Sequence, residues 1–347
     1  MDGSEPDHAP RICVVAPTPL LVMEIAAGAA GQAGTATSIE PADEGPEVPE
    51  QHADIHMHPG GQGLWVARMA VSLGAAVTVC GPFGGELGSS IVQMLNAAEL
   101  TVRSVTAGAG NGAYVFDLRG QDREIVAHMP PPPLTRHELD DLYGTVLVDA
   151  LDSDVLVLTG AEPASVVPPS FFGRITADVR AAGKPVVADL SGEAATAAAE
   201  AGPTVLKMSH EEVVEAGLAE DSTEALRQAA EGLVAGGVTA MVVSRAADPA
   251  LLVTADGARY AVGPVVSPLD HRGAGDSMTA GIAVGLGRGL EVTDAVRLGA
   301  AAGALNVTRR GLGTGRRDQI ERFAERVSIT DADTADNGDG EEAEGAD

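Results

Sequence analysis

From about residue 136 onward, the sequence alternates between short apolar runs and longer stretches in which apolar residues recur every three or four positions. The short runs have the length of buried strands, and the longer spacing is typical of helices that pack on one side. The predicted strands are 155–159, 185–189, 205–208, 240–244, 250–254 and 260–262. The predicted helices are 136–150, 169–182, 193–201, 211–216, 223–235, 276–288 and 292–308. This alternation predicts an α/β fold with a mostly parallel sheet that helices cover on both faces.

The chain before residue 136 follows a less regular pattern. The apolar run Arg11–Ala16 predicts a buried strand, and Pro17 and Pro19 end it because proline has no N–H group for a central strand. Further strands are predicted at 20–26, 53–58, 76–80, 102–106, 113–118 and 122–127, and helices at 64–73 and 89–99. The strands near 20–26, 53–58 and 113–127 lie outside the alternation, so we expect them to form a small β lid over the body.

Composition divides the chain into a globular domain and polar extensions. Hydrophobic residues make up 45% of the 347 residues, which is enough for a sizeable core. We expect the domain to span 11–325, after a disordered N-terminus at 1–10 and before an acidic disordered tail at 326–347. Residues 28–50, rich first in Ala and Gly and then in Pro and acidic residues, predict a flexible insertion.

Charge and cysteine usage exclude several functions. The formal net charge of −28 disfavours partners with a phosphate backbone or an anionic surface, so we expect no nucleic-acid or membrane partner. Cys13 and Cys80 lie inside apolar runs without metal-ligand spacing, which predicts buried free thiols in a reducing compartment. The N-terminus lacks the basic and apolar regions of a signal peptide, and no apolar run is long enough to cross a bilayer. We therefore expect a cytoplasmic protein.

The strongest chemical signal is the sequence Gly273-Ala-Gly-Asp276 at the start of a predicted helix. Small residues let the backbone approach a ligand, and the N–H groups of a helix N-terminus favour a phosphate or a developing anion. Asp276 is then well placed to take a proton from a hydroxyl that attacks the phosphate. The alternative from these residues alone is an ordinary loop in which Asp276 caps the helix.

Four collinear stretches give this signal a family context. They are 59–75 with its Gly-Gly-Gln-Gly, 187–194 (Val-Ala-Asp-Leu-Ser-Gly-Glu-Ala), 206–213 (Leu-Lys-Met-Ser-His-Glu-Glu-Val) and 272–281 (Arg-Gly-Ala-Gly-Asp-Ser-Met-Thr-Ala-Gly). Their order and separation over 11–325 resemble the PfkB (ribokinase-like) carbohydrate kinases, most of all the phosphofructokinase and tagatose-6-phosphate kinase branch. The resemblance implies a three-layer α/β/α sandwich with a β lid, a possible homodimer through that lid, and ATP-dependent phosphorylation of a sugar or sugar-phosphate hydroxyl.

The resemblance also implies roles for single residues. Asp276 matches the base, Gly273, Ala274 and Gly275 match the anion hole, and Glu212 matches the glutamate that helps to place Mg²⁺. The positions expected to bind the nucleotide are Lys207, Ser209, Ser244, Arg272 and Asn306. The positions expected to bind the substrate are Gly60, Gly61, Gln62, Trp65 and Asn111. Without the family context, a solvated helix acid is the better explanation of Glu212, and Lys207 fits an exposed residue at a strand end as well as a phosphate contact.

Several positions depart from the family pattern on the acceptor side. Val22 stands where an aspartate holds sugar hydroxyls, Trp65 where an asparagine follows the glycines, and Asn111 near the arginine that grips a substrate phosphate. An amide does not replace a planar guanidinium on a phosphate, so we expect fructose 6-phosphate to be a poor substrate. Trp65 fits either a wall on which a ring stacks or a packed core residue.

The nucleotide side departs as well. Ser244 is followed by 245–249 without the family's two glycines, and Ser209 replaces an asparagine. Arg272 displaces a threonine and would bring positive charge toward the nucleotide phosphates. Two alternatives therefore stay open beside the sugar kinase: a degenerate relative that binds a ligand or partner with little kinase activity, and a nucleoside kinase in which Trp65 stacks on a base.

Overall fold

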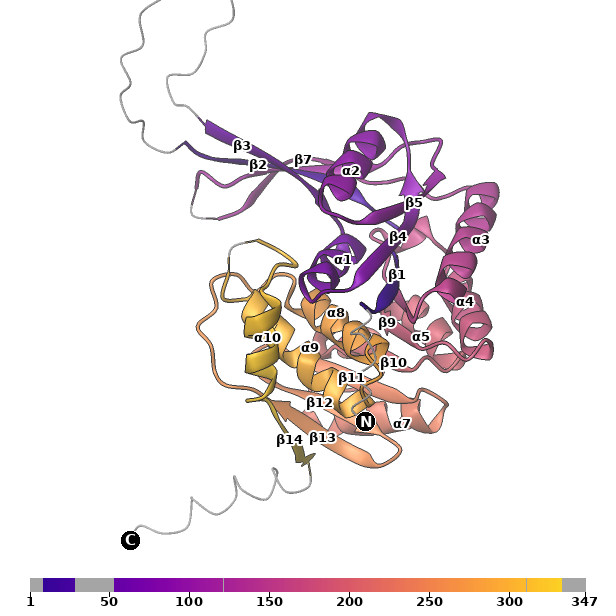
Figure 1. Cartoon of the computed structure of the whole chain (residues 1–347), viewed down its shortest axis with the longest axis vertical. Helices are drawn as coiled ribbons and strands as arrows, with labels where there is room; N and C mark the ends of the chain where they lie inside the picture. The colour runs from indigo at the N-terminus through magenta and orange to yellow at the C-terminus, as the bar shows by residue number, and fades with distance from the viewer. Residues whose placement is uncertain (1–8, 29–52, 121, 310, 333–347) are drawn as a thin grey trace, which may run out of the picture.

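The computed structural model describes residues 9–28, 53–120, 122–309 and 311–332, and these form two β-sheets with helices around the larger one (Figure 1). The large sheet has the order β14-β13-β12-β11-β10-β9-β8-β1-β4-β5. Its strands are β1 Arg11–Val15, β4 Ala76–Phe83, β5 Thr101–Thr106, β8 Val155–Thr159, β9 Val186–Asp189, β10 Val205–Ser209, β11 Ala240–Arg245, β12 Asp248–Thr254, β13 Gly257–Val262 and β14 Ser328–Asp331. The pairs from β5 to β11 are parallel, and those from β11 to β14 are antiparallel.

Two layers of helices cover the faces of this sheet. One layer contains α1 Gln62–Ser72, α2 Gly85–Ala97, α8 Ala274–Gly287, α9 Val292–Asn306 and α10 Arg317–Ala324. The other contains α3 Arg136–Asp152, α4 Pro169–Ala181, α5 Gly192–Glu200, α6 His210–Glu215 and α7 Thr223–Ala235. All five residues of β8 are buried, because a strand covered on both faces must be apolar on both. The predicted three-layer α/β/α architecture is thus confirmed.

The second sheet projects from one end of this body as a lid (Figure 1). Its order is β3-β2-β6-β7, with β2 Leu20–Ala27, β3 Ala53–Gly60, β6 Gly112–Asp117 and β7 Glu124–Met129. Strands β2 and β6 are parallel, and the two outer pairs are antiparallel. The lid strands that we expected at 113–118 and 122–127 correspond to β6 and β7, which are paired with each other.

Several boundaries differ from the sequence prediction. Strand β4 continues to Phe83, and α2 begins at Gly85 rather than at 89. Helix α10 was not predicted, because Ile320 is its single buried residue and its sequence is otherwise mostly polar. The predicted disorder from 326 is wrong for 328–331, which form β14 on the free edge of β13. The N-terminus up to residue 8, the insertion from 29 and the tail from 333 lie outside the described residues.

Among the described residues, no helix combines the length and the apolar character that crossing a membrane requires.

Candidate active site

Helix α8 begins at a sharp turn that presents its first N–H groups. Gly273 has φ of 70°, a left-handed conformation that glycine adopts without strain, and the helix starts at Ala274, two residues before the predicted start. Asn306 fixes this turn: its amide nitrogen donates to the Arg272 carbonyl (2.8 Å), and its amide oxygen accepts from the Gly313 N–H (3.1 Å). We expected Asn306 to bind the nucleotide, but its buried amide holds backbone instead.

Asp276 lies in the first turn of α8 and is only 9% exposed. Burial raises the pKa of its carboxyl to about 7, and the negative charge of Asp189 acts in the same direction. The charge of Lys207 and a hydrogen bond from the Gln62 side chain oppose this rise. A carboxyl with a pKa near neutrality at the start of a helix can exchange a proton with a bound hydroxyl.

Gln62 joins the first turn of α1 to this carboxyl. Its side-chain oxygen accepts from the Gly160 N–H (2.8 Å), which leaves its amide nitrogen for Asp276. Gly60 and Gly61 precede it in close contacts, since a Cβ on Gly60 would lie 2.5 Å from a Val22 methyl group. Of the residues that we expected at the substrate, Gln62 is thus the one that contacts the Asp276 carboxyl, and Gly60 and Gly61 precede it in the chain.

A buried ion pair lies beneath the N-terminus of α8. The Lys207 nitrogen is 3.0 Å from one Asp189 oxygen, and the Thr279 hydroxyl donates to the other at 2.6 Å. Burial would lower the pKa of Lys207, but the negative charges around it outweigh burial and raise it. Lys207 is also packed against Gly275, where a Cβ would lie 2.6 Å from the ammonium nitrogen. Lys207 is thus buried rather than exposed at a strand end, and its role toward the nucleotide stays a prediction.

Glu212 and Ser209 form a capping box at the start of α6. The Ser209 hydroxyl accepts from the Glu212 N–H (3.2 Å), and one Glu212 oxygen accepts from the Ser209 N–H (2.7 Å). Burial raises the pKa of Glu212 despite these contacts. Ser209 pairs in register with Ser244 of the neighbouring strand, so both serines lie at the carboxyl edge of the sheet. This edge is where α/β sheets bind their ligands.

The residues that we expected on the acceptor side differ in their burial and in their hydrogen bonds. Val22 is buried at the base of the lid, and Trp65 on α1 is partly buried. The indole N–H of Trp65 is buried, and no described residue accepts its hydrogen bond. Asn111 is 5% exposed and bonds only backbone groups at the root of the lid, so our expectation that it contacts substrate is not supported.

Two arginines bring positive charge to this part of the molecule. Arg123 was not singled out from the sequence, and Arg272 was expected at the nucleotide. Arg123, just before β7, lies 3.2 Å from Glu24 and stacks 3.4 Å over the ring of Phe116. Burial, followed by the positive charge of Arg272, lowers the pKa of Arg123. Arg272 itself holds Asp270 through two hydrogen bonds of 2.9 and 2.6 Å.

Comparison with known proteins agrees with this geometry. The profile of the pfkB family carbohydrate kinases matches residues 34–319. The chain belongs to this family. The kinase is 31% identical to the ATP-dependent 6-phosphofructokinase isozyme 2 of Mycobacterium tuberculosis over 274 residues, which are 77% of this chain and 79% of that protein. It is 28% identical to the 1-phosphofructokinase of Bacillus subtilis over 79% of this chain and 88% of that protein.

Solved structures show the same fold. Phosphofructokinase-2 from Escherichia coli in complex with potassium superposes with a TM-score of 0.73 at 22% identity, covering 91% of this chain and 98% of that chain. The predicted resemblance and the predicted class, an ATP-dependent carbohydrate kinase that phosphorylates a hydroxyl, are both confirmed. Asp189 and Thr279 are the site residues that sequence reasoning missed, although 187–194 had been matched as a stretch.

Proposed function

We propose that this kinase transfers the γ-phosphoryl group of ATP to a hydroxyl of a sugar phosphate, with Asp276 as general base. The observation that carries the proposal is the buried Asp276 carboxyl, with a pKa of about 7, in the first turn of α8. Such a group is ionised often enough at neutral pH to accept a proton, and basic enough to hold it. The phosphorylated acceptor is suggested by the names of the relatives, which are 6-phosphofructokinase and 1-phosphofructokinase.

The reaction needs little covalent chemistry from the protein. Gln62 orients the Asp276 carboxylate, which takes the proton of the attacking hydroxyl as its oxygen approaches the γ-phosphorus. The N–H groups of Gly273, Ala274 and Gly275 then face the charge that develops on the transferred phosphoryl group, and the Lys207 ammonium beneath Gly275 adds positive potential there. Closure of the lid would exclude water from this space.

The residues present fit a magnesium ion that is bound mainly by nucleotide phosphates and water. Glu212 uses one carboxylate oxygen for its capping box and keeps the other. Burial and the negative charge of Asp189 raise the pKa of Glu212, which means that they disfavour its ionised form. A bound cation would favour the ionised form. Mg²⁺ usually takes one or two carboxylates, several waters and phosphate oxygens, and it neutralises phosphate charge when bound. We propose Glu212 as its protein contact.

The nucleotide is proposed to lie along the carboxyl edge of β10 and β11. Ser209 and Ser244 are paired there, and Arg272 precedes the anion hole. Asn306 and Lys207 act from below, by fixing the Arg272–Gly273 turn and by charge, rather than by direct contact with the nucleotide.

The acceptor is proposed to be held in a way that differs from the family pattern. Val22 and Trp65 offer an apolar methyl surface and an indole where the family has carboxylate and amide groups. Arg123 supplies a lid cation near the catalytic loop, and its Nε is buried with no hydrogen-bond partner among the described residues. A guanidinium is well suited to a phosphate, so Arg123 supports a phosphorylated acceptor even though Asn111 does not.

The experiment is a screen for ATP- and Mg²⁺-dependent phosphorylation of fructose phosphates, tagatose 6-phosphate, free hexoses and nucleosides. We expect turnover with a sugar phosphate other than fructose 6-phosphate, and none in Asp276→Asn. Turnover with nucleosides alone, reduced by Trp65→Ala, would support the nucleoside kinase. If no compound in the screen is phosphorylated and the protein does not bind ATP, the results would support the degenerate relative with little kinase activity. Full turnover in Asp276→Asn would refute the assigned base.

A homodimer through the lid is proposed from the apolar residues on its edge strands. Ile55 and Met57 of β3 share one face because they are two positions apart, and both are more than half exposed. The edge strand β7 carries further exposed apolar residues, Ile125, Val126 and Met129. Ile55→Lys should yield a monomer in sedimentation velocity. Val148→Lys, at an equally exposed apolar position on α3, is the control that should leave the dimer intact.

A further inference from the structure

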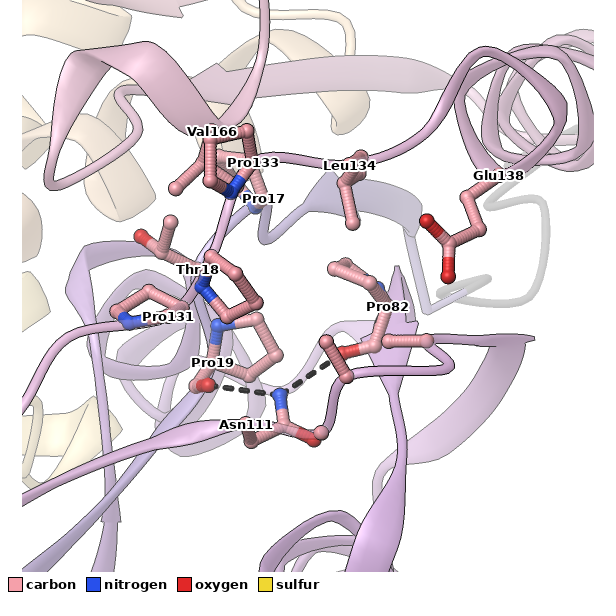
Figure 2. Close-up of a pocket in the computed structure, with 14 residues that line it drawn as sticks. Pro17, Thr18, Pro19, Pro82, Asn111, Pro131, Pro133, Leu134, Glu138 and Val166 are labelled. Carbon is pink, nitrogen blue, oxygen red and sulfur yellow. Dashed lines mark hydrogen bonds between the residues drawn. The ribbon is translucent and has the colours of Figure 1, made fainter.

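Six prolines gather at the junction of the body and the lid, five of them in the connecting segments and one in body strand β4 (Figure 2). They line a small pocket together with Asn111, and they are Pro17, Pro19, Pro82, Pro131, Pro132 and Pro133. Each proline fixes its own φ angle, so these crossings are stiff segments rather than flexible linkers. The relative position of lid and body therefore depends on what holds the stiff segments together.

Asn111 is the side chain that joins them. Its amide nitrogen donates to the Pro19 carbonyl (2.9 Å) and to the Pro82 carbonyl (3.0 Å), and Figure 2 shows both bonds. Its amide oxygen accepts from the Gly84 N–H (2.9 Å). Both amide protons and the oxygen are thus used, in a residue that is 5% exposed. A buried amide with all three interactions formed strongly favours a single arrangement of its partners.

The three partners belong to three different elements. Pro19 immediately precedes lid strand β2, Pro82 lies at the end of body strand β4, and Gly84 caps α2. Glycine at position 88 allows α2 to approach this amide closely, because a Cβ on Gly88 would lie 2.6 Å from the Asn111 amide oxygen. An alanine at position 111 would leave all three backbone partners without these bonds.

The same segment touches the start of α1. Thr18, next to Pro19, accepts a hydrogen bond from the Glu162 N–H (3.2 Å), and its carbonyl oxygen would lie 2.7 Å from a Cβ on Gly61. Gly61 caps the helix from which Gln62 reaches Asp276. A shift of Pro19 would therefore move both the first lid strand and the backbone that carries Gln62.

We propose that Asn111 is a positioning residue that fixes the lid relative to the catalytic body. It acts through Pro19, Pro82 and Gly84 and touches no substrate. Without it, the lid strands sample more open positions while the ten-stranded sheet stays intact. The structural part of this inference stands apart from the proposed function, and only its kinetic consequence rests on that function.

The test is hydrogen exchange of the full-length protein as wild type, Asn111→Ala and Asn111→Asp. Asn111→Asp keeps an acceptor for the Gly84 N–H but loses both donated hydrogen bonds. It serves as the test variant if Asn111→Ala does not fold. Asn96→Ala, at an exposed position on α2, is the control. We expect amides of β2 and β6 to exchange at least about tenfold faster in the Asn111 variants, with β8 to β11 unchanged.

Equal acceleration in the lid and in β8 to β11 would show a merely structural residue and would overturn the proposal, as would exchange identical to that of the control. With an acceptor in hand, KM for the acceptor should rise about tenfold while KM for ATP stays the same. If the screen finds no acceptor, the proposed function fails and the exchange measurement still decides the role of Asn111.

Discussion

The ammonium nitrogen of Lys207 lies 3.0 Å from a carboxylate oxygen of Asp189, and both side chains are buried. The pair comes from adjacent parallel strands, where Asp189 and Lys207 are opposite each other in register. Thr279 of α8 completes the contacts of Asp189 from above. Lys207 also lies against Gly275, and its positive charge lowers the pKa of Asp276.

Replacing Lys207 by Met should reduce both stability and activity. The substitution leaves Asp189 buried without its cation, which lowers the free energy of unfolding by about 3–5 kcal/mol in comparable cases. It also removes a charge that holds down the pKa of Asp276, so activity should require a higher pH. Urea unfolding and a pH–rate profile measure the two effects. Lys184→Met, which removes one bond to the Ser153 carbonyl, is the control and should leave the profile unchanged.

The rate should depend on the protonation of Asp276. A general base works only when ionised, so below its pKa of about 7 the value of kcat/KM should fall about tenfold for each pH unit, and above it the rate should level off. Initial rates in buffers from acidic to alkaline pH measure this. A flat profile across neutrality would contradict the assignment of Asp276 as base.

Stability should show the opposite dependence on pH. The folded pKa of Asp276 is raised above the value of an unfolded chain, so between these two values the folded protein binds more protons than the unfolded one. The contribution of Asp276 to stability therefore declines as pH rises toward 7. Asp276→Asn removes this ionisation and should raise Tm at pH 8 relative to wild type, although it abolishes turnover. An unchanged or lower Tm at that pH would argue against the burial of an ionised carboxylate.

Gly275, in the first turn of α8, should tolerate alanine poorly, and Gly289, beyond the C-terminal end of the same helix, provides the comparison. Gly289→Ala places a Cβ at φ of 78° with no neighbour within 4 Å, so it introduces backbone strain of about 1 kcal/mol alone. Gly275→Ala introduces no such φ strain but collides with the Lys207 ammonium group. We expect Gly289→Ala to lower Tm and keep kcat. Gly275→Ala should lower kcat by at least about a hundredfold through displacement of the anion hole. Equal kcat values for the two variants would contradict this.

Much of the fold was predictable because its signals are local. Strands β8, β9 and β10 are short runs of mostly buried and mostly apolar residues, and the helices between them carry apolar residues on one side. Helix α10 was not predicted because Ile320 is its single buried residue, so the sequence shows no apolar face. Strand β14 was not predicted because it is stabilised by hydrogen bonds to β13, which lies far away in the sequence.

The turn before α8 was predictable for the same reason, since Gly273 to Asp276 are contiguous, and the family resemblance supplied the roles that we expect for them. Asn111 bonds backbone groups because the fold brings Pro19, Pro82 and Gly84 around it, and these partners are too far away in the sequence to be recognised from it. Asn306 was misassigned because its partners, Arg272 and Gly313, come from two separate loops.

The sequence by itself determined the family, the layered architecture and the turn that carries Asp276, because each depends on residues close together in the chain. The tertiary structure alone decided the proton affinity of that carboxyl, the burial of Lys207 against Asp189, and the role of Asn111 at the root of the lid. These properties depend on charges, solvent exclusion and hydrogen bonds between distant segments. Exclusion of water strengthens these hydrogen bonds and shifts these pKa values, and water is excluded only when the chain is folded.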